Sequence, residues 1–328
     1  MPEKIRVGLI GCGGIMRGHA KRLLSIPEVE IVALDDISDE MLDHFYEAVP
    51  EVKGLPVFYD YREMLDKVEM DAVEIATPHT LHFQQTMDCL DAGKHILLEK
   101  PMVCSVEHAH KLIAKAEEKQ RVVVISYQRH YQPEFRYMRD VIREGKLGNV
   151  TYISALQCQN WKKGTVGMWR QDPELSGGGQ LNDSGSHLID IILWTTGLAV
   201  DELFGYIDNL STPVDINSAL SMKFKNGAQA TVAVVGDAPP FYEDFTIWGN
   251  DGMLFYRNGQ LTQCGADGRI FTPENLPAGG NPDQNLVDAI LGRDIVWSPP
   301  ICGLRVIELT ESAWKSAEIG CPVKVRSL

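Results

Sequence analysis

The sequence lacks long uncharged hydrophobic runs and is poor in basic residues, with 31 Lys and Arg against 45 Asp and Glu and a formal net charge of −14. A membrane-spanning helix needs about 18 consecutive apolar residues, so we expect no membrane segment. Nucleic acids and anionic lipids bind positive surfaces, which argues against both as partners. A strand is expected from Lys4 to Ile10 and leaves no room for a signal peptide, so we expect a cytoplasmic protein.

The seven cysteines are scattered, odd in number and include no Cys-x-x-Cys pair. Such pairs are typical of structural zinc and redox sites, so we expect free thiols and no structural metal. Internal repeats and low-complexity tracts are also lacking. What remains is a chain of 328 residues that is 44% hydrophobic, enough for two well-cored domains.

The first 127 residues alternate short Val- and Ile-rich runs with amphipathic helical segments, such as those over 80–92 and 105–119. This alternation predicts a doubly wound parallel sheet with helices on both faces. Six strands are expected, at residues 5–10, 30–35, 57–59, 71–76, 95–98 and 121–126. We interpret residues 1–127 as a nucleotide-binding α/β domain.

Residues 128–328 have a different pattern and predict an α+β domain with a large, mainly antiparallel open sheet. A helix is expected over 133–144, and strands with tight turns follow at Asn226-Gly227, Asn258-Gly259 and Asp267-Gly268. Another helix is expected over 182–196. Two more are expected near 285–291 and 303–319.

A glycine-rich loop, Gly11-Cys12-Gly13-Gly14-Ile15-Met16, directly follows the first strand and opens a helix. In such a unit the glycines allow a tight turn and a close approach to a pyrophosphate, which the helix N-terminus stabilises. Met16 stands where the usual pattern has a third small residue, which suggests looser packing of the helix on the strand.

An acidic pair, Asp35-Asp36, ends the second strand, about 20 residues further on, where a carboxylate can bind an adenosine ribose. No Arg or Lys follows that could bind a 2′-phosphate, so NAD is favoured over NADP. The alternative is that Asp36 or Ser38 only caps the next helix.

The ends of the predicted parallel strands carry titratable residues, and ligands bind beyond this edge of such sheets. The exits are Gly11 to Gly13, Asp36, Thr77-Pro78-His79, Glu99-Lys100-Pro101 and Tyr127-Gln128-Arg129. Lys100 precedes a proline, which restricts its backbone, and desolvation beside a nicotinamide would favour its neutral form. The alternative is a surface lysine paired with Glu99.

These residues resemble the glucose–fructose oxidoreductase and inositol dehydrogenase (Gfo/Idh/MocA) family of nicotinamide-dependent enzymes. The resemblance rests on Gly11-x-Gly13 with His19, on Thr77-Pro78-His79-x-x-His82, on Glu99-Lys100-Pro101, and on Gly177-Gly178-Gly179-x-x-x-Asp183-x-Gly185-x-His187-x-x-Asp190. It covers nearly the whole chain and implies an N-terminal Rossmann domain followed by a substrate-binding and oligomerisation domain.

The resemblance also implies residue roles. Lys100 matches the family's catalytic lysine, and Asp183 and His187 match its substrate-side acid and histidine. His79 stands where the family more often has Asn, and family members often hold the bond before the proline that matches Pro101 in cis. With the motifs above, the residues expected to contact NAD are Gly11, Gly13, Gly14, Ile15, Met16, Asp35, Asp36, Thr77, Pro78, His79, His82, Glu99, Lys100 and Arg129.

The predicted helix over 182–196 places Asp183, His187, Asp190 and Trp194 on one face. His187 can exchange a proton near neutral pH, and a neighbouring carboxylate would orient its ring. A metal site built from Asp183, His187 and Asp190 is the alternative, which we disfavour because no Cys or second His lies nearby in sequence.

Aromatic and cationic residues upstream, at Trp161-Lys162 and Trp169-Arg170, suit a polyhydroxylated or carboxylated ligand. The tryptophans could instead pack between the domains. The residues expected to contact substrate are Lys100, Tyr127, Trp161, Arg170, Asp183 and His187.

We therefore expect an NAD-dependent dehydrogenase or reductase that acts on a secondary hydroxyl of a sugar, cyclitol or related polyol held between the domains. The family resemblance leaves two alternatives, a non-enzymatic NAD- or sugar-sensing regulatory protein and a glycoside hydrolase that uses NAD transiently. Strands such as 231–235 are apolar on both faces, which predicts a homodimer or homotetramer joined through the second sheet.

Overall fold

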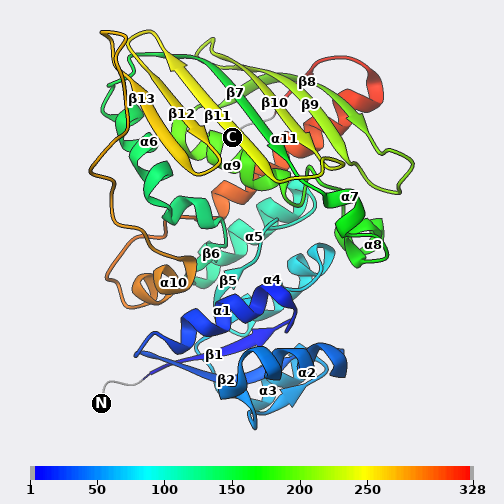
Figure 1. Cartoon of the computed structure of the whole chain (residues 1–328). Coiled ribbons are helices and arrows are strands. Elements are labelled where there is room, and N and C mark those ends of the chain that lie inside the picture. The colour runs from blue at the N-terminus through cyan, green and yellow to red at the C-terminus, as the bar shows by residue number, and fades with distance from the viewer. Residues whose placement is uncertain (1–3, 326–328) are drawn as a thin grey trace. The chain divides into compact units, whose positions relative to one another are not determined.

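The computed structural model describes residues 4–325, which form two compact units (Figure 1). Of the described residues, the first unit comprises 4–103, 107–128 and 280–303, and the second comprises 104–106, 129–279 and 304–325. Within the described residues, no helix is long and apolar enough to cross a membrane.

The first unit contains a six-stranded, fully parallel sheet in the order β3-β2-β1-β4-β5-β6. Its strands are β1 (Ile5–Ile10), β2 (Val29–Asp35), β3 (Val57–Phe58), β4 (Ala72–Ile75), β5 (His95–Leu98) and β6 (Val123–Ile125). All six predicted strands are present, and the order has the doubly wound form. The central strands are buried along almost their whole length, as expected for a sheet that is covered on both faces.

The connections of this sheet are helices, as the alternating pattern predicts (Figure 1). They are α1 (Gly14–Leu24), α2 (Asp39–Ala48), α3 (Tyr61–Lys67), α4 (His82–Asp91) and α5 (Val106–Lys119), with short 3-10 turns η1 (Pro50–Val52), η2 (His79–Leu81) and η3 (Gln128–Tyr131). Met16 is fully buried in the core that α1 shares with β1 and β2, so the expected looser packing is not found.

The chain returns to the first unit near its C-terminal end, which corrects the expected assignment of all of 128–328 to the second domain. Helix α10 (Pro282–Ile290) buries Leu286 and Val287 in the core of the first unit. Beyond it, the carbonyl of Ser298 accepts a hydrogen bond from the backbone N–H of Ile125 in β6. The returning segment therefore covers the edge of the parallel sheet.

The second unit contains a nine-stranded sheet in the order β14-β13-β12-β11-β7-β10-β9-β8-β15. Its strands are β7 (Val150–Cys158), β8 (Val200–Asp208), β9 (Asn217–Phe224), β10 (Gln229–Val235), β11 (Tyr242–Gly249), β12 (Met253–Arg257), β13 (Gln260–Cys264), β14 (Ile270–Phe271) and β15 (Val323–Lys324). Neighbours pair antiparallel except for β7 and β10. The three predicted tight turns join β9 to β10, β12 to β13 and β13 to β14.

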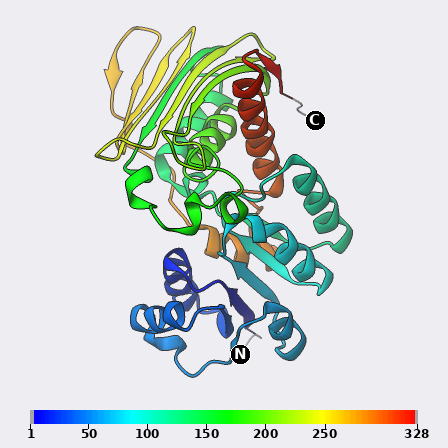
Figure 2. The same cartoon turned by 90° about the vertical axis from the view of Figure 1, so that its right-hand side faces the viewer.

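Helices cover one face of this second sheet (Figure 2). They include α6 (Pro133–Arg143), α9 (Gly185–Thr196) and α11 (Pro300–Ile319), and short turns α7 (Trp161–Gly164), η4 (Trp169–Gln171) and α8 (Pro173–Ser176) lie between β7 and α9. Gly205 of β8 lies close to Ala313 of α11, and its N–H donates to the Ser316 hydroxyl. The long C-terminal helix is thus fixed to the sheet by both packing and a hydrogen bond.

Helix α9 begins at Gly185, three residues later than the sequence predicts. The buried carboxylate of Asp215 accepts hydrogen bonds from the backbone N–H groups of Gly179 and Leu181, at 2.9 and 2.7 Å. These bonds hold the chain before α9 in a loop. Asp183 therefore lies in the turn that leads into the helix and not on the helix itself.

Candidate active site

The glycine loop after β1 has the shape that a pyrophosphate needs. Gly11 has a φ of +85°, and a Cβ there would lie 2.9 Å from the carbonyl oxygen of Ala76. Gly13 and Gly14 are different, because a Cβ on either would meet nothing within 4 Å. Helix α1 starts here with no side-chain cap and no acidic residue in its first turn, which leaves its N-terminus suited to an anion.

The two acidic residues after β2 differ in their surroundings. Asp36 accepts the N–H of Cys12 at 2.7 Å and the N–H of Ser38 at 2.9 Å, which ties it to the glycine loop. Asp35 is buried, and its burial, with the charges of Asp36 and Asp60, raises its pKa to about 7. The cap of α2 is Ser38, whose hydroxyl accepts the N–H of Met41. Asp36 is therefore the carboxylate that fits a ribose.

The exits of β4 and β5 are linked by His82. Its ring is fully buried, with Nδ1 2.9 Å from the carbonyl oxygen of Pro101 and Nε2 2.9 Å from that of Thr77. The ring of His79 packs edge-on against it. Burial lowers the pKa of His82. His82 thus connects the segments that follow β4 and β5. The peptide bond between Lys100 and Pro101, in the second of these segments, is cis.

Glu99 and Lys100 are in contact, though not as a surface ion pair. Glu99 is buried, and its Oε2 accepts the backbone N–H of Lys100 at 3.1 Å. Burial opposes its charge, but the hydrogen bond and charge of His19, with the charge of Lys100, lower the pKa of Glu99 to about 2. A fixed carboxylate therefore supports the backbone at the candidate catalytic lysine.

The two candidate residues after β6, Tyr127 and Arg129, belong to different units. Tyr127 is fully buried in the first unit. Arg129 belongs to the second unit, where its guanidinium pairs with Glu243 of β11 and lies over the ring of Phe135. The structure thus assigns Arg129 a carboxylate partner from its own unit, and Glu243 is a residue that the sequence analysis did not identify.

Asp183 is the centre of the candidate substrate residues in the second unit. Its Oδ2 accepts hydrogen bonds from Trp161 Nε1 at 2.8 Å and from Arg170 Nε at 3.1 Å. The Arg170 guanidinium also lies over the ring of Trp169, 4.4 Å from its centroid. The structure therefore brings together three side chains that the sequence predicted for one site, from three separate short segments.

Helix α9 carries His187 in its first turn. The helix is buried on nearly all sides, and His187 is half-buried among residues that are mostly inaccessible. Its neighbours Leu188, Ile191 and Ile192 are buried, as expected. A histidine that keeps access to solvent at the start of a buried helix is suited to proton exchange.

Asp190 and Trp194, which follow His187 along α9, contact residues of η3 and α6. The carboxylate of Asp190 lies 2.7 Å from Nε2 of the buried His130, and the ring of His130 stacks on Trp194. The guanidinium of Arg139 also lies over the ring of Trp194, 4.2 Å from its centroid. His187, Asp190 and Trp194 lie on α9 at the predicted spacings, and Asp190 is engaged in a buried pair with His130.

The glycines before Asp183 serve close packing inside the second unit. A Cβ on Gly179 would lie 2.0 Å from the carbonyl oxygen of Asp215, and one on Gly178 would lie 2.6 Å from the ring of Trp314. Trp314 also donates its indole N–H to Asp215. Sequence analysis missed Asp215, because nothing near it in the sequence indicates that it holds this loop.

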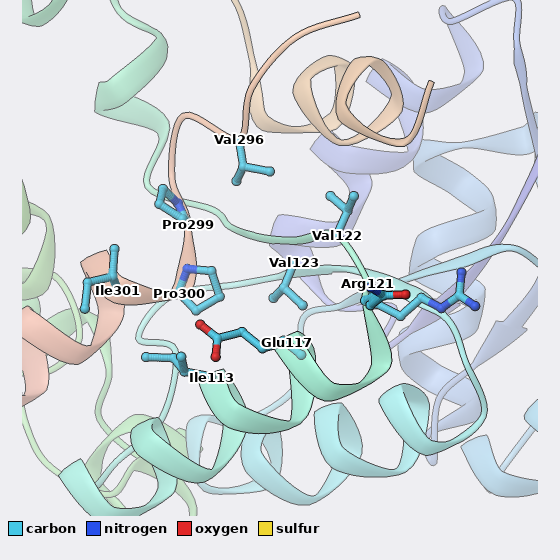
Figure 3. A pocket seen from close by; sticks show the side chains of 11 residues that line it. Ile113, Glu117, Arg121, Val122, Val123, Val296, Pro299, Pro300 and Ile301 are labelled. Carbon is cyan, nitrogen blue, oxygen red and sulfur yellow. The ribbon is translucent and has the colours of Figure 1, made fainter. Parts of the chain in front are cut away.

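A pocket of about 500 Å³ lies elsewhere in the first unit (Figure 3). It is formed by the end of α5, the start of β6 and residues 296–301, and Glu117 and Arg121 are its charged residues. Because ligands of open parallel sheets bind beyond the carboxyl ends of the strands, a pocket at the amino end of β6 is not a site for the cofactor.

The parallel sheet and the glycine loop after β1 have the form of a dinucleotide-binding Rossmann domain. Residues 5–127 match the model of an oxidoreductase family with an NAD-binding Rossmann fold, and residues 135–255 match the GFO/IDH/MocA C-terminal domain. The chain therefore belongs to the GFO/IDH/MocA oxidoreductase family, as the motifs predicted.

Several curated proteins are similar over much of the chain. An uncharacterized oxidoreductase, YrbE of Bacillus subtilis, is 24% identical over 84% of this chain and 81% of its own length. The rhizopine catabolism protein MocA of Rhizobium meliloti is 31% identical over 59% of this chain. The scyllo-inositol 2-dehydrogenase (NADP(+)) IolW of B. subtilis is 28% identical over 60%. The chain spans 58% and 53% of the lengths of these last two proteins.

Solved structures share the fold over the whole chain. A levoglucosan dehydrogenase in complex with NADH has a TM-score of 0.88 and 20% identity, covering 99% of this chain and all of that one. The WlbA dehydrogenase of Bordetella pertussis, in complex with NADH and UDP-GlcNAcA, has a TM-score of 0.85 and 23% identity, with coverage of 99% and 100%.

Proposed function

We propose that this protein is an NAD-dependent dehydrogenase that acts on a secondary hydroxyl of a sugar, cyclitol or related polyol. The observation that carries the proposal is Asp183, buried and held by Trp161 and Arg170 one turn before His187. An aromatic ring, a cation and an orienting carboxylate are the groups that bind polyols. The named activities of the relatives IolW, a scyllo-inositol 2-dehydrogenase, and levoglucosan dehydrogenase support the same substrate class.

Lys100, Asp183 and His187 have separate roles in the proposed reaction. Bound NAD would supply the hydride acceptor, held by the loop at Gly13 and by Asp36. Lys100 would take the proton of the substrate hydroxyl as that secondary alcohol is oxidised to a ketone. Asp183 orients that hydroxyl, and His187 passes the proton to solvent. Lys100 belongs to the first unit, and Asp183 and His187 belong to the second.

NAD is the preferred cofactor in this proposal. Asp36 is fixed beside the glycine loop, where its charge would repel a 2′-phosphate, and no basic residue follows it before Met41. The relative IolW uses NADP(+) by its name, so the preference requires its own measurement. Titration with NADH and NADPH in parallel measures it directly.

The test of the catalytic assignment is Lys100→Met. We expect turnover to fall by orders of magnitude while NADH still binds, because only the proton acceptor is lost. Lys94→Met is the matched control, since Lys94 stands just before β5, at the opposite end from Lys100, and donates to the carbonyl of Met70. Unchanged turnover in Lys100→Met would overturn the assignment.

A panel of polyols, followed at the absorbance band of reduced nicotinamide, separates the dehydrogenase from its alternatives. A sensing protein would bind NAD and sugar without reduction. A glycoside hydrolase would release a free sugar with no net reduction. Metal analysis of the purified protein belongs to the same panel, because a stoichiometric metal required for turnover would contradict the proposed proton transfer.

We also propose that the protein forms a homodimer or homotetramer through the open face of its second sheet. Among residues 4–325, helices cover one face of that sheet and leave the other open (Figure 2). Two aromatic pairs, Tyr152 with Trp248 and Phe204 with Tyr206, are at least partly accessible, and Tyr206 is 71% exposed. Such surfaces are typical of subunit interfaces. Sedimentation equilibrium that shows only monomer would contradict this proposal.

A further inference from the structure

A buried group of charged residues connects α1, the middle of the parallel sheet and the returning helix α10. His19 lies at its centre, with Nε2 2.9 Å from Glu99 Oε1 and Nδ1 2.8 Å from Asp283 Oδ1. His19 and Asp283 are fully buried and Glu99 is 4% exposed. All of them belong to the first unit. Because Glu99 also accepts the N–H of Lys100, a continuous chain of contacts leads from Asp283 to Lys100.

The charges along this chain are fixed. Burial opposes protonation of His19, but its hydrogen bonds to Asp283 and Glu99 raise its pKa to about 10. His19 is therefore an imidazolium that donates to a carboxylate on each side. Because the same charged ring donates to both Asp283 and Glu99, it fixes the orientation of each carboxylate.

The remaining members balance these charges. Arg22 of α1 donates to the second oxygen of Asp283. Glu74 of β4 is fully buried, with one oxygen 3.6 Å from His19 Nδ1, and burial together with Asp283 raises its pKa well above the usual value. Asp283 and Glu99 thus face the cations Arg22 and His19.

A metal ion is the other occupant that these residues could suggest, because His19, Glu74 and Asp283 have ligand atoms close together. The guanidinium of Arg22 and the imidazolium of His19 already supply the positive charge there. A divalent cation would have to displace both, so the group works as a hydrogen-bonded network and not as a metal site.

We propose that His19 and Asp283 are positioning residues for Lys100. His19 fixes the carboxylate of Glu99, Glu99 fixes the backbone at Lys100, and Asp283 fixes His19 from the other side. The backbone that carries the Lys100 amine is thereby held in one position. Small displacements of a reacting group have large effects on rate. The proposal rests on the proposed catalytic role of Lys100.

The experiment compares His19→Gln and Asp283→Asn, which keep side-chain size and remove one charge of opposite sign each. We expect kcat to fall about tenfold to a hundredfold in both, with the NADH dissociation constant within about twofold of wild type. His95→Gln is the matched control, because His95 begins β5 at the end opposite to Lys100 and accepts the N–H of Val122. Its kcat should remain unchanged.

The pH profile of kcat distinguishes positioning from a merely structural role. Loss of the imidazolium should move the profile to higher pH, because Lys100 then faces a less compensated carboxylate, and loss of Asp283 should move it to lower pH. The groups that face His19 are Arg22, Glu74, Glu99 and Asp283, and all of them remain in at least one of the two variants. Opposite shifts are not expected from a general loss of stability.

Two results would overturn the proposal. One is wild-type kcat with an unshifted profile in the variants. The other is a loss of kcat that is matched by equal losses of NADH affinity and melting temperature, which would show a structural role alone. If His19→Gln does not fold, the near-isosteric Asp283→Asn still gives the required profile. If Lys100→Met itself retains turnover, the proposed function fails, whereas an inactive Lys100→Met with normal His19→Gln refutes only the positioning role.

Discussion

The glycine loop allows a prediction that separates cofactor binding from folding. Gly13 has a φ of −70°, and a Cβ there would meet nothing within 4 Å. Gly13→Ala should therefore change the free energy of unfolding by no more than about 0.5 kcal/mol. The added methyl group stands where a pyrophosphate must approach the N-terminus of α1. We expect NADH affinity to fall at least tenfold, or about 1.4 kcal/mol.

Gly11→Ala is the comparison. Its φ of +85° is costly for alanine, and its Cβ would lie 2.9 Å from the carbonyl oxygen of Ala76. The backbone strain alone is about 1–2 kcal/mol, which lowers the melting temperature of a unit of this size by about 2–8 °C. Thermal melts and fluorescence titration with NADH measure the two effects. If Gly13→Ala binds NADH as wild type does, the pyrophosphate does not lie over this loop.

Three further predictions concern other parts of the structure. Asp36→Ser should weaken NADH binding and raise the ratio of NADPH to NADH affinity, because a negative charge beside the ribose is removed; parallel titrations that show an unchanged ratio would contradict this role. Gly179→Ala should destabilise the second unit by about 2 kcal/mol or more in urea unfolding, since its Cβ would collide with the carbonyl oxygen of Asp215; a smaller loss would mean that the loop relaxes. The raised pKa of His19, about 10 against about 6.5 when unfolded, predicts that its ion pairs stabilise the protein fully below pH 6.5 and progressively less up to pH 10, so the difference in urea midpoint between wild type and His19→Gln should shrink over this range.

The fold could be predicted from the sequence where the signals are local. The six parallel strands and the turns at Asn226-Gly227 and Asn258-Gly259 depend on short apolar runs and turn residues, and all are present. The start of α9 could not be predicted, because it is set by Asp215, which lies more than 30 residues beyond the loop that it holds. Local helical periodicity gives no information on such a bond.

The candidate site shows the same division. Motif spacing predicts a site role for Asp183, and the structure supplies Trp161 and Arg170 as its hydrogen-bond partners. Spacing on a helix also grouped Asp190 with His187, whereas the partner of Asp190 is His130, 60 residues earlier in the chain. Helical periodicity places residues on one face, but it does not say which neighbour covers each part of that face.

The return of residues 280–303 to the first unit has a consequence for biosynthesis. Helix α10 buries Leu286 and Val287 in the first core and supplies Asp283 to His19. A nascent chain that has emerged only to residue 127 still lacks this helix, so the nucleotide-binding unit cannot complete its core on the ribosome until nearly the entire second unit has been translated. We expect a fragment that ends at residue 127 to expose this unfilled core and to aggregate. In the full-length protein, the unit that is synthesised first is therefore among the last to reach its native structure.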